Sequence, residues 1–300
     1  MSPVPEPILQ ALSLPKDSSL STTPGSGFTS TATIHTKSPT KTDPQEHTHF
    51  LKTSPNGSSA SEMFTGESTS LNAIATSVPG FCPKALAHGA LDAKTHYLAT
   101  EYLNLGEPGK SKGEASLVHR LGKLHSTPAP ADPETGRVRF GFPVPTFCGD
   151  TKQPNTFHDS WCEFYAKERL LTVLATSEER NGADTALRDA VEKTVDVVVP
   201  RLLGDGHLGF DAAGVGKGIV PVVVHGDLWS GNVGRGRIGG GEVGDVVYDP
   251  SACYAHSEFE LGIMKMFGGF GGRFFEEYHK LVPKTEPVEE YGDRVELYEL

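Results

Sequence analysis

Residues 222–232 read Val-Val-Val-His-Gly-Asp-Leu-Trp-Ser-Gly-Asn, and this stretch decides the fold. The run of valines predicts a buried strand that ends at His225 and delivers Asp227. Asn232 follows Asp227 after four intervening residues, which is the spacing of a phosphotransferase catalytic loop. In that chemistry the Asp accepts the proton of an attacking hydroxyl, and the Asn ligates a magnesium ion held against ATP.

A second strand-like run, residues 244–248, delivers another carboxylate, Asp249, 22 residues after Asp227. This interval fits a short β-hairpin between a catalytic base and the main metal ligand. The plain alternative is a turn-rich hairpin in which the Asp and Asn side chains only cap loops. The order of the three residues favours the phosphotransferase interpretation.

The composition limits the remaining functional classes. The chain has 300 residues, enough for two lobes, and a net charge of -11. This excess of negative charge argues against a surface that binds nucleic acid or an anionic membrane. No apolar stretch approaches the roughly 18 residues needed to span a membrane. Four dispersed cysteines without a signal-peptide pattern predict reduced thiols and a cytoplasmic location.

A candidate nucleotide-binding region precedes this loop. Residues 18–59 are rich in Ser, Thr, Gly and Pro, which is also typical of a disordered linker, but 29–36 and 49–53 carry strand-like patterns. Lys52 lies in the second of these, and Glu67 follows 15 residues later in a predicted helix over 62–76. A strand Lys paired with a helix Glu holds the ATP phosphates in kinase-like folds, although a lone strand Lys is usually an exposed edge residue. The turn at Gly25 and Gly27 would cover the nucleotide.

The other patterns predict an α+β fold with two lobes. Strands are expected over 83–88 and 97–102, and residues 128–149 are expected to form an ordered loop. Helices are expected over 113–125, 159–175, 178–203, 258–267 and 273–280. We therefore predict a small β-rich N-terminal lobe over 1–103 and a larger, mainly helical C-terminal lobe over 104–300. An apolar helical pattern begins at 295 and is interrupted at Leu300, from which we expect a chain truncated at its C-terminus.

Several segments together resemble one family. The stretches His225-Gly-Asp-Leu-Trp-Ser-Gly-Asn232, Asp249-Pro-Ser-Ala-Cys-Tyr-Ala-His-Ser-Glu258 and Met266-Phe-Gly-Gly-Phe270 resemble the fructosamine/ketosamine-3-kinase (protein-ribulosamine 3-kinase) family. Further similar segments are Met63-Phe-Thr-Gly-Glu67, Glu101-Tyr-Leu-Asn-Leu-Gly106, Phe140-Gly-Phe142, Gln153-Pro-Asn155 and Trp161-Cys-Glu-Phe164. The Trp-Ser-Gly insert at 229–231 distinguishes this family from aminoglycoside and choline kinases, which share the wider Asp-x4-Asn pattern.

The resemblance implies a protein-kinase-like fold and ATP-dependent phosphorylation of the sugar 3-hydroxyl of ketosamines. These are fructosamine or ribulosamine adducts of lysine, on proteins or on free amines, and the phosphate makes them release the amine, which amounts to deglycation repair. The implied cofactors are ATP and Mg²⁺. The family normally continues past Leu300 with a further helical segment, and the nucleotide loop 23–28 of this chain is less regular than the catalytic loop.

The resemblance also implies roles for individual residues. Asp227 would be the base, Asn232 and Asp249 the Mg²⁺ ligands. Lys52 would anchor the phosphates with Glu67 as its partner. The remaining positions are the adenine-binding hinge, Glu101, Tyr102 and Leu103, and a substrate side with Trp229, His256 and Glu258, the last of which is also a candidate helix cap.

Two alternatives stay open at this point. The first is an aminoglycoside- or choline-kinase-like phosphotransferase that acts on another small hydroxyl compound. The second is a catalytically inert, nucleotide-binding pseudokinase or scaffold. The preferred sugar, the choice between protein-bound and free amino-acid substrates, and the oligomeric state are not determined by the sequence.

Overall fold

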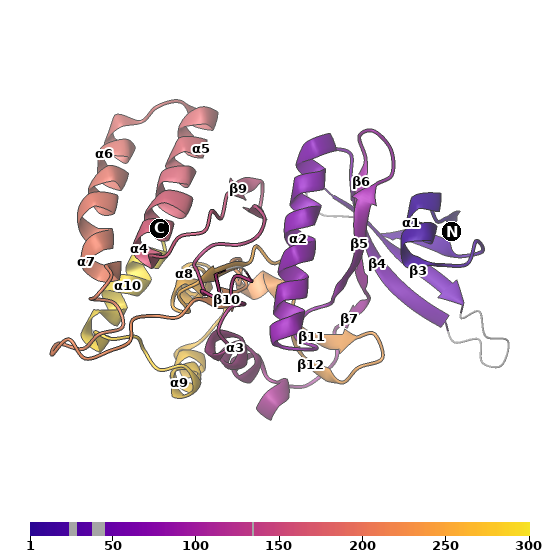
Figure 1. Ribbon diagram of the computed structural model, residues 1–300. Coiled ribbons are helices and arrows are strands. Elements are labelled where there is room, and N and C mark those ends of the chain that lie inside the picture. The colour runs from indigo at the N-terminus through magenta and orange to yellow at the C-terminus, as the bar shows by residue number, and fades with distance from the viewer. Residues whose placement is uncertain (24–28, 38–45, 134) are drawn as a thin grey trace. The chain divides into compact units, whose positions relative to one another are not determined.

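The computed structural model describes residues 1–23, 29–37, 46–133 and 135–300, and its contacts divide the chain into two compact units (Figure 1). Unit 1 comprises residues 1–116 and 234–248, and unit 2 comprises 117–233 and 249–300. The first is built on an antiparallel sheet and the second mainly on helices, so the expected α+β class is confirmed. Within the described ranges, no helix has both the length and the apolar character needed to cross a membrane.

Unit 1 contains a six-stranded sheet in the order β1-β2-β3-β4-β6-β5. The strands predicted in the Ser/Thr-rich region are confirmed, because β3 and β4 pair over eight residues, from Ser30↔Thr53 to Lys37↔Glu46. Alternation along β4 places Leu51 in the core that packs on α1 and turns Lys52 toward α2. The elements are β1 Ser2–Pro3, α1 Glu6–Leu12, β2 Ser19–Thr23, β3 Ser30–Lys37, β4 Glu46–Ser54, α2 Gly57–Ser77, β5 Ala85–Ala90 and β6 His96–Glu101.

A second, three-stranded sheet in unit 1 changes the expected division of the chain. Strand β11 (Val233–Ile238) pairs with β12 (Val243–Val247) on one side and with β7 (Leu103–Leu105) on the other. The Ser111 hydroxyl also donates to Asp245 over 2.6 Å. Residues 104–116 and 234–248 therefore belong with unit 1, whereas the sequence assigned everything after 103 to the second lobe. Strands β7 and β11, like Ser111 and Asp245, lie more than a hundred positions apart, so no local pattern indicates that these segments pair.

Unit 2 packs its helices around an aromatic and aliphatic core. Trp161, Phe164, Leu121 and Leu124 are all at most 1% exposed, and β10 (Val222–Val224) pairs with β13 (Cys253–Ala255) beside them. The other elements are α3 Leu117–Ser126, β8 Thr146–Cys148, β9 Thr151–Gln153, α4 Trp161–Tyr165, α5 Thr172–Asn181, α6 Thr185–Lys193, α7 Val199–Leu203, α8 Phe259–Met266, α9 Gly272–Leu281 and α10 Tyr291–Tyr298. Turns of π-helix, Ala166–Leu171 and Thr194–Val198, join α4 to α5 and α6 to α7.

Two sequence expectations fail in unit 2. The continuous helix expected over 178–203 is interrupted, because Gly182 takes a φ of 86° after α5 and Asp184 caps α6 by accepting from the Leu187 amide over 3.0 Å. The segment 128–149 was expected as a loop, but its end forms β8, which pairs with β9. Both strands have only three residues, too few for a period-of-two pattern to be recognised.

Candidate active site

Strand β10 delivers the catalytic loop that the sequence predicted. Its three valines are buried, His225 is 1% exposed, and the chain then turns through Gly226 to Asp227. The Asn232 side-chain amide donates to the Asp227 carbonyl over 2.8 Å and to Asp227 Oδ2 over 3.1 Å. The four-residue gap between them is closed by a short 3₁₀ turn, Ser230–Asn232. The structure therefore brings the predicted base and the predicted amide ligand into direct contact.

The environment of Asp227 suits a general base. Burial raises the pKa of Asp227 to about 6, hydrogen bonds from Cys148 and Asn232 oppose this rise, and the charges of Glu260 and Asp249 add to it. A base works best when its pKa lies near the operating pH, because it is then ionised yet able to hold a proton. At neutral pH Asp227 is a carboxylate with a greater proton affinity than an exposed aspartate has.

A buried carboxylate on α8 holds the backbone ahead of Asp227. The amides of His225 and Gly226 both donate to Glu260, the latter over 3.0 Å, and Glu260 is 1% exposed. Buried backbone N–H groups need acceptors, and the strand has already ended at this point. Sequence reasoning missed Glu260. The available signal was a lone acidic residue within the otherwise apolar stretch 259–264.

The loop that follows Asp249 packs tightly against the catalytic loop. Gly226 has a φ of +79°, and a Cβ placed there would lie 2.0 Å from the Ser251 carbonyl oxygen. The Ser251 amide in turn donates to the His225 carbonyl over 2.9 Å. Only glycine fits both the backbone conformation and this distance. Asp249 itself is exposed, has a φ of +57°, and lies close enough to contribute to the raised pKa of Asp227.

The side chains that could hold a magnesium ion are of the right kind. Because the Asn232 amide nitrogen is engaged with Asp227, its oxygen is the atom that can ligate a cation. Together with the Asp249 carboxylate it offers hard oxygen ligands, which Mg²⁺ prefers. Residues outside the masked positions contain no cluster of three or more His, Cys, Asp or Glu able to bind a metal. Two protein ligands are enough where nucleotide phosphates complete the coordination.

In unit 1 the predicted lysine–glutamate pair is present. Lys52 Nζ lies 2.6 Å from Glu67 Oε1, and the two side chains are 14% and 18% exposed. The pair joins β4 to α2, as the 15-residue spacing indicated. Gly25 and Gly27, the expected nucleotide-covering turn, lie outside the described residues.

The expected adenine-binding segment, Glu101, Tyr102 and Leu103, is partly engaged within unit 1. The Glu101 amide donates to the Lys84 carbonyl over 2.9 Å, and the Tyr102 carbonyl accepts from Gly239 over 2.9 Å. Leu103 begins β7 and lies opposite Ile238. An adenine contact would therefore use other polar groups of this short segment.

The three residues expected on the substrate side separate into two groups. Trp229 is 40% exposed, and its ring lies 6.0 Å from that of Phe267, which is 62% exposed. His256 and Glu258, by contrast, are each 2% exposed. Their burial argues against the substrate contact expected for them, because their polar atoms bond within the protein.

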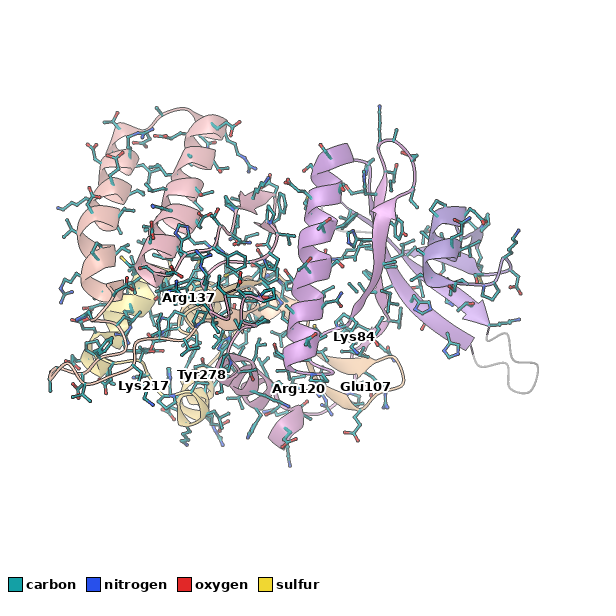
Figure 2. All side chains as sticks on the ribbon, viewed as in Figure 1. Lys84, Glu107, Arg120, Arg137, Lys217 and Tyr278 are labelled. Atoms are coloured by element: carbon teal, nitrogen blue, oxygen red, sulfur yellow. The ribbon has the colours of Figure 1, made fainter. Side chains whose placement is uncertain are left out.

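His256 and Glu258 belong to a buried polar cluster that fastens α10 to α8. The His256 ring bonds the Tyr298 hydroxyl over 2.9 Å and the Thr285 hydroxyl over 2.8 Å. Glu258 accepts from Arg294, which is fully buried, over 2.8 Å. Burial pushes the pKa of Glu258 upward, but His256 and Arg294 together hold it below its usual range. Tyr278 of α9, labelled in Figure 2, also bonds His125 of α3 over 2.8 Å.

A buried strand that ends in an aspartate–asparagine pair, together with a strand lysine bonded to a helix glutamate, is the arrangement expected of a protein-kinase-like phosphotransferase. Residues 19–300 match the profile described as fructosamine kinase. The chain therefore belongs to the fructosamine kinase family.

Curated relatives and solved structures agree with this assignment. The chain is 32% identical over 256 residues to the ketosamine-3-kinase of Mus musculus, covering 80% of this chain and 76% of the relative. It is 33% identical over 250 residues to a chloroplastic protein-ribulosamine 3-kinase of Oryza sativa subsp. indica, covering 83% and 65%.

Among solved structures, a putative fructosamine-3-kinase from Thermobifida fusca superposes with a TM-score of 0.71 at 24% identity, over 99% of this chain and 90% of that one. Aminoglycoside phosphotransferase APH(4)-Ia superposes with a TM-score of 0.53 at 13% identity, over 97% and 85%. These likenesses confirm the kinase-like fold.

The close approach at Gly226 predicts a position-specific loss of stability. We expect Gly226→Ala to lower the free energy of unfolding by about 3 kcal/mol, because Cβ would meet the Ser251 carbonyl and favour a different φ. Urea denaturation measures the change. Gly240→Ala is the control, since a Cβ there meets nothing within 4 Å. Equal losses in the two variants would contradict the packing of these loops.

The buried cluster predicts an acid-sensitive stability. Burial lowers the pKa of His256 to about 4 from its ordinary 6.5; the Glu258 charge opposes this shift, and the charges of Arg294 and His125 add to it. As the pH falls, His256 is therefore protonated at a higher pH in the unfolded chain than in the folded protein. The free energy of unfolding should fall as the pH drops from 6.5 toward 4, by up to about 3 kcal/mol, and this loss should be absent above 6.5.

Urea titrations of the wild type and His256→Asn between pH 4 and 8 measure this effect. The variant should be less stable at pH 7, and the gap between the two proteins should narrow as the pH falls. A gap that stays constant across the range would show that His256 does not titrate with a lowered pKa.

Proposed function

We propose that this protein is an ATP-dependent kinase that phosphorylates the sugar 3-hydroxyl of ketosamines on lysine, in proteins or in free amines. The observation that carries the proposal is the carboxylate of Asp227, half-buried and bonded to Asn232 at the end of β10. The names of the relatives from Mus musculus and Oryza sativa support ketosamines as the substrate class. ATP use is supported by a solved complex of APH(4)-Ia, 14% identical, that contains ADP and hygromycin B.

In this proposal Asp227 receives the proton of the attacking sugar hydroxyl. Asn232 orients the carboxylate, and both Asn232 and Asp249 would hold the magnesium ion. When bound, Mg-ATP supplies the phosphoryl group and the metal neutralises phosphate charge. Phosphoryl transfer depends mostly on positioning and electrostatics, so a base, metal ligands and a phosphate-binding cation suffice. Lys52 would provide that cation, oriented by Glu67.

Trp229 is the remaining candidate for substrate binding from the sequence. Its exposed ring and that of Phe267 form an aromatic surface on unit 2, with Trp229 two residues beyond Asp227. Aromatic faces pack well against the C–H groups of a sugar or the methylene stem of a lysine. We propose that they hold the ketosamine, and that its phosphorylation promotes release of the amine and so repairs glycated protein. The four described thiols are all free, which fits the reducing cytoplasm that we propose as its location.

Turnover with and without the base tests the function. With Mg-ATP and a ribulosamine-lysine substrate, we expect the wild type to release ADP and Asp227→Asn to lose about 10³-fold in kcat. Asp189→Asn, an exposed residue of α6, is the charge-matched control and should keep wild-type activity.

The alternatives give different results in the same assay. Turnover of hygromycin B but of no ketosamine would favour an aminoglycoside-type kinase. Stabilisation by ATP without turnover of any substrate would indicate a nucleotide-binding scaffold.

The lysine–glutamate pair gives a separate prediction for nucleotide binding. Lys52→Met should weaken ATP binding roughly 10- to 100-fold, the effect expected from losing one charge-assisted hydrogen bond. Glu67→Gln should weaken it less, since the amide still accepts from Lys52. The ATP dependence of the melting temperature measures both, and Lys94→Met on an exposed turn serves as the control. Unchanged ATP affinity in Lys52→Met would exclude Lys52 as the phosphate anchor.

A further inference from the structure

The hairpin formed by β8 and β9, residues 146–153, contacts the catalytic loop of unit 2. Cys148 Sγ lies 3.6 Å from Asp227 Oδ1, a distance at which the thiol donates a hydrogen bond. Asn232 donates to the other carboxylate oxygen, Oδ2, over 3.1 Å. Each carboxylate oxygen thus has one donor, so rotation of the group is restricted from both sides. Each oxygen also keeps a lone pair for a substrate proton.

The same hairpin contacts the loop that follows Asp249. The Ser251 hydroxyl donates to Gln153 Oε1 over 3.1 Å, and the Thr146 hydroxyl shares that acceptor at 3.4 Å. Ser251 is 1% exposed, and its backbone makes the close approach to Gly226. Gln153 therefore holds the junction at which the catalytic loop and the Asp249 loop touch.

Register and anchoring explain how three-residue strands can position these groups. Thr146 lies opposite Gln153, and Cys148 is two residues along the same strand, so the three side chains share one face. The hairpin is bonded to the interior through the buried Asn155, which donates to the Thr146 hydroxyl over 2.8 Å and accepts from Arg169 over 2.7 Å. Both Asn155 and Arg169 are at most 5% exposed, so the hairpin is fixed to the interior of unit 2.

We propose that the β8–β9 hairpin positions the groups of phosphoryl transfer, with Cys148 fixing the carboxylate of Asp227 and Gln153 fixing the Asp249 loop through Ser251. The proposal rests on the kinase function proposed above. Cys148 and Gln153 act through other residues, so they are positioning residues and not catalytic ones. A misplaced base costs rate without weakening substrate binding, because its contribution is made in the transition state.

Steady-state kinetics of hairpin variants test the proposal. Cys148→Ala and Gln153→Ala should each lower kcat about ten-fold, while KM for ATP and for the ketosamine changes less than about two-fold. Cys148→Ser should recover most of the rate, because a hydroxyl can donate the same hydrogen bond. In the double variant the loss should be smaller than the product of the single losses, since both contacts act through one hairpin.

The control is Asp150→Asn, which weakens the exposed ion pair to Arg180 at the hairpin turn and leaves both contacts intact. Its kcat should equal that of the wild type. A wild-type kcat in both Cys148→Ala and Gln153→Ala would overturn the proposal. So would equal rises in KM and falls in melting temperature across the hairpin variants, Asp150→Asn included, because these would indicate a general structural role.

A second measurement needs no turnover and therefore separates this proposal from the kinase function. Burial, and secondly the Asp227 charge, raise the pKa of the Cys148 thiol to about 12, which keeps it protonated and slow to alkylate. Iodoacetamide labelling followed by mass spectrometry should show several-fold faster modification of Cys148 in Asp227→Asn than in the wild type, with the buried Cys253 unchanged in both. Equal labelling rates at Cys148 would refute the thiol–carboxylate contact, whether or not the protein phosphorylates ketosamines.

Discussion

The structure of the catalytic region depends on one buried carboxylate, Glu260. At the end of β10 the backbone leaves the strand, and the amides of His225 and Gly226 would have no partners inside the protein. Unpaired buried donors cost about 1–3 kcal/mol each, so the loop needs an acceptor at this point. Glu260 serves both amides, and this lets the chain turn through Gly226 and present Asp227. The contacts to Asn232, Cys148 and Ser251 all require that turn.

Glu260 can fulfil this role because α8, which carries it, is itself fastened by a buried ion pair. Glu258 precedes α8 and is bonded to Arg294 of α10, and both side chains are almost completely buried. Such a pair gains little over an apolar contact, but removing one partner leaves a buried charge and costs several kcal/mol. Tyr298 of α10 also accepts a hydrogen bond from Trp161 over 2.8 Å. The C-terminal helix thus contributes to holding the catalytic loop without contacting it.

Much of the site could be predicted from the sequence because its parts are local. The valine run before His225, the four-residue gap to Asn232, and the strand and helix that carry Lys52 and Glu67 all follow from short-range patterns. The structure confirms the contacts within both pairs. It also confirms the strands predicted in the Ser/Thr-rich region, where composition alone allowed disorder. Each success concerns residues that lie within about 25 positions of one another.

The sequence by itself determined the kinase-like class, the strands β3, β4, β5 and β6 of the larger sheet, and the identity of the candidate base. Tertiary structure decided which polar residues have access to solvent. His256 and Glu258 lie near Asp249 in sequence, yet packing against α10 buries them, whereas Trp229 remains exposed. It also decided that the hairpin between Asn232 and Asp249 joins unit 1, and that Cys148 reaches an aspartate 79 residues away. Local periodicity specifies which face of an element is apolar, but a partner distant in sequence is selected only when the chain packs.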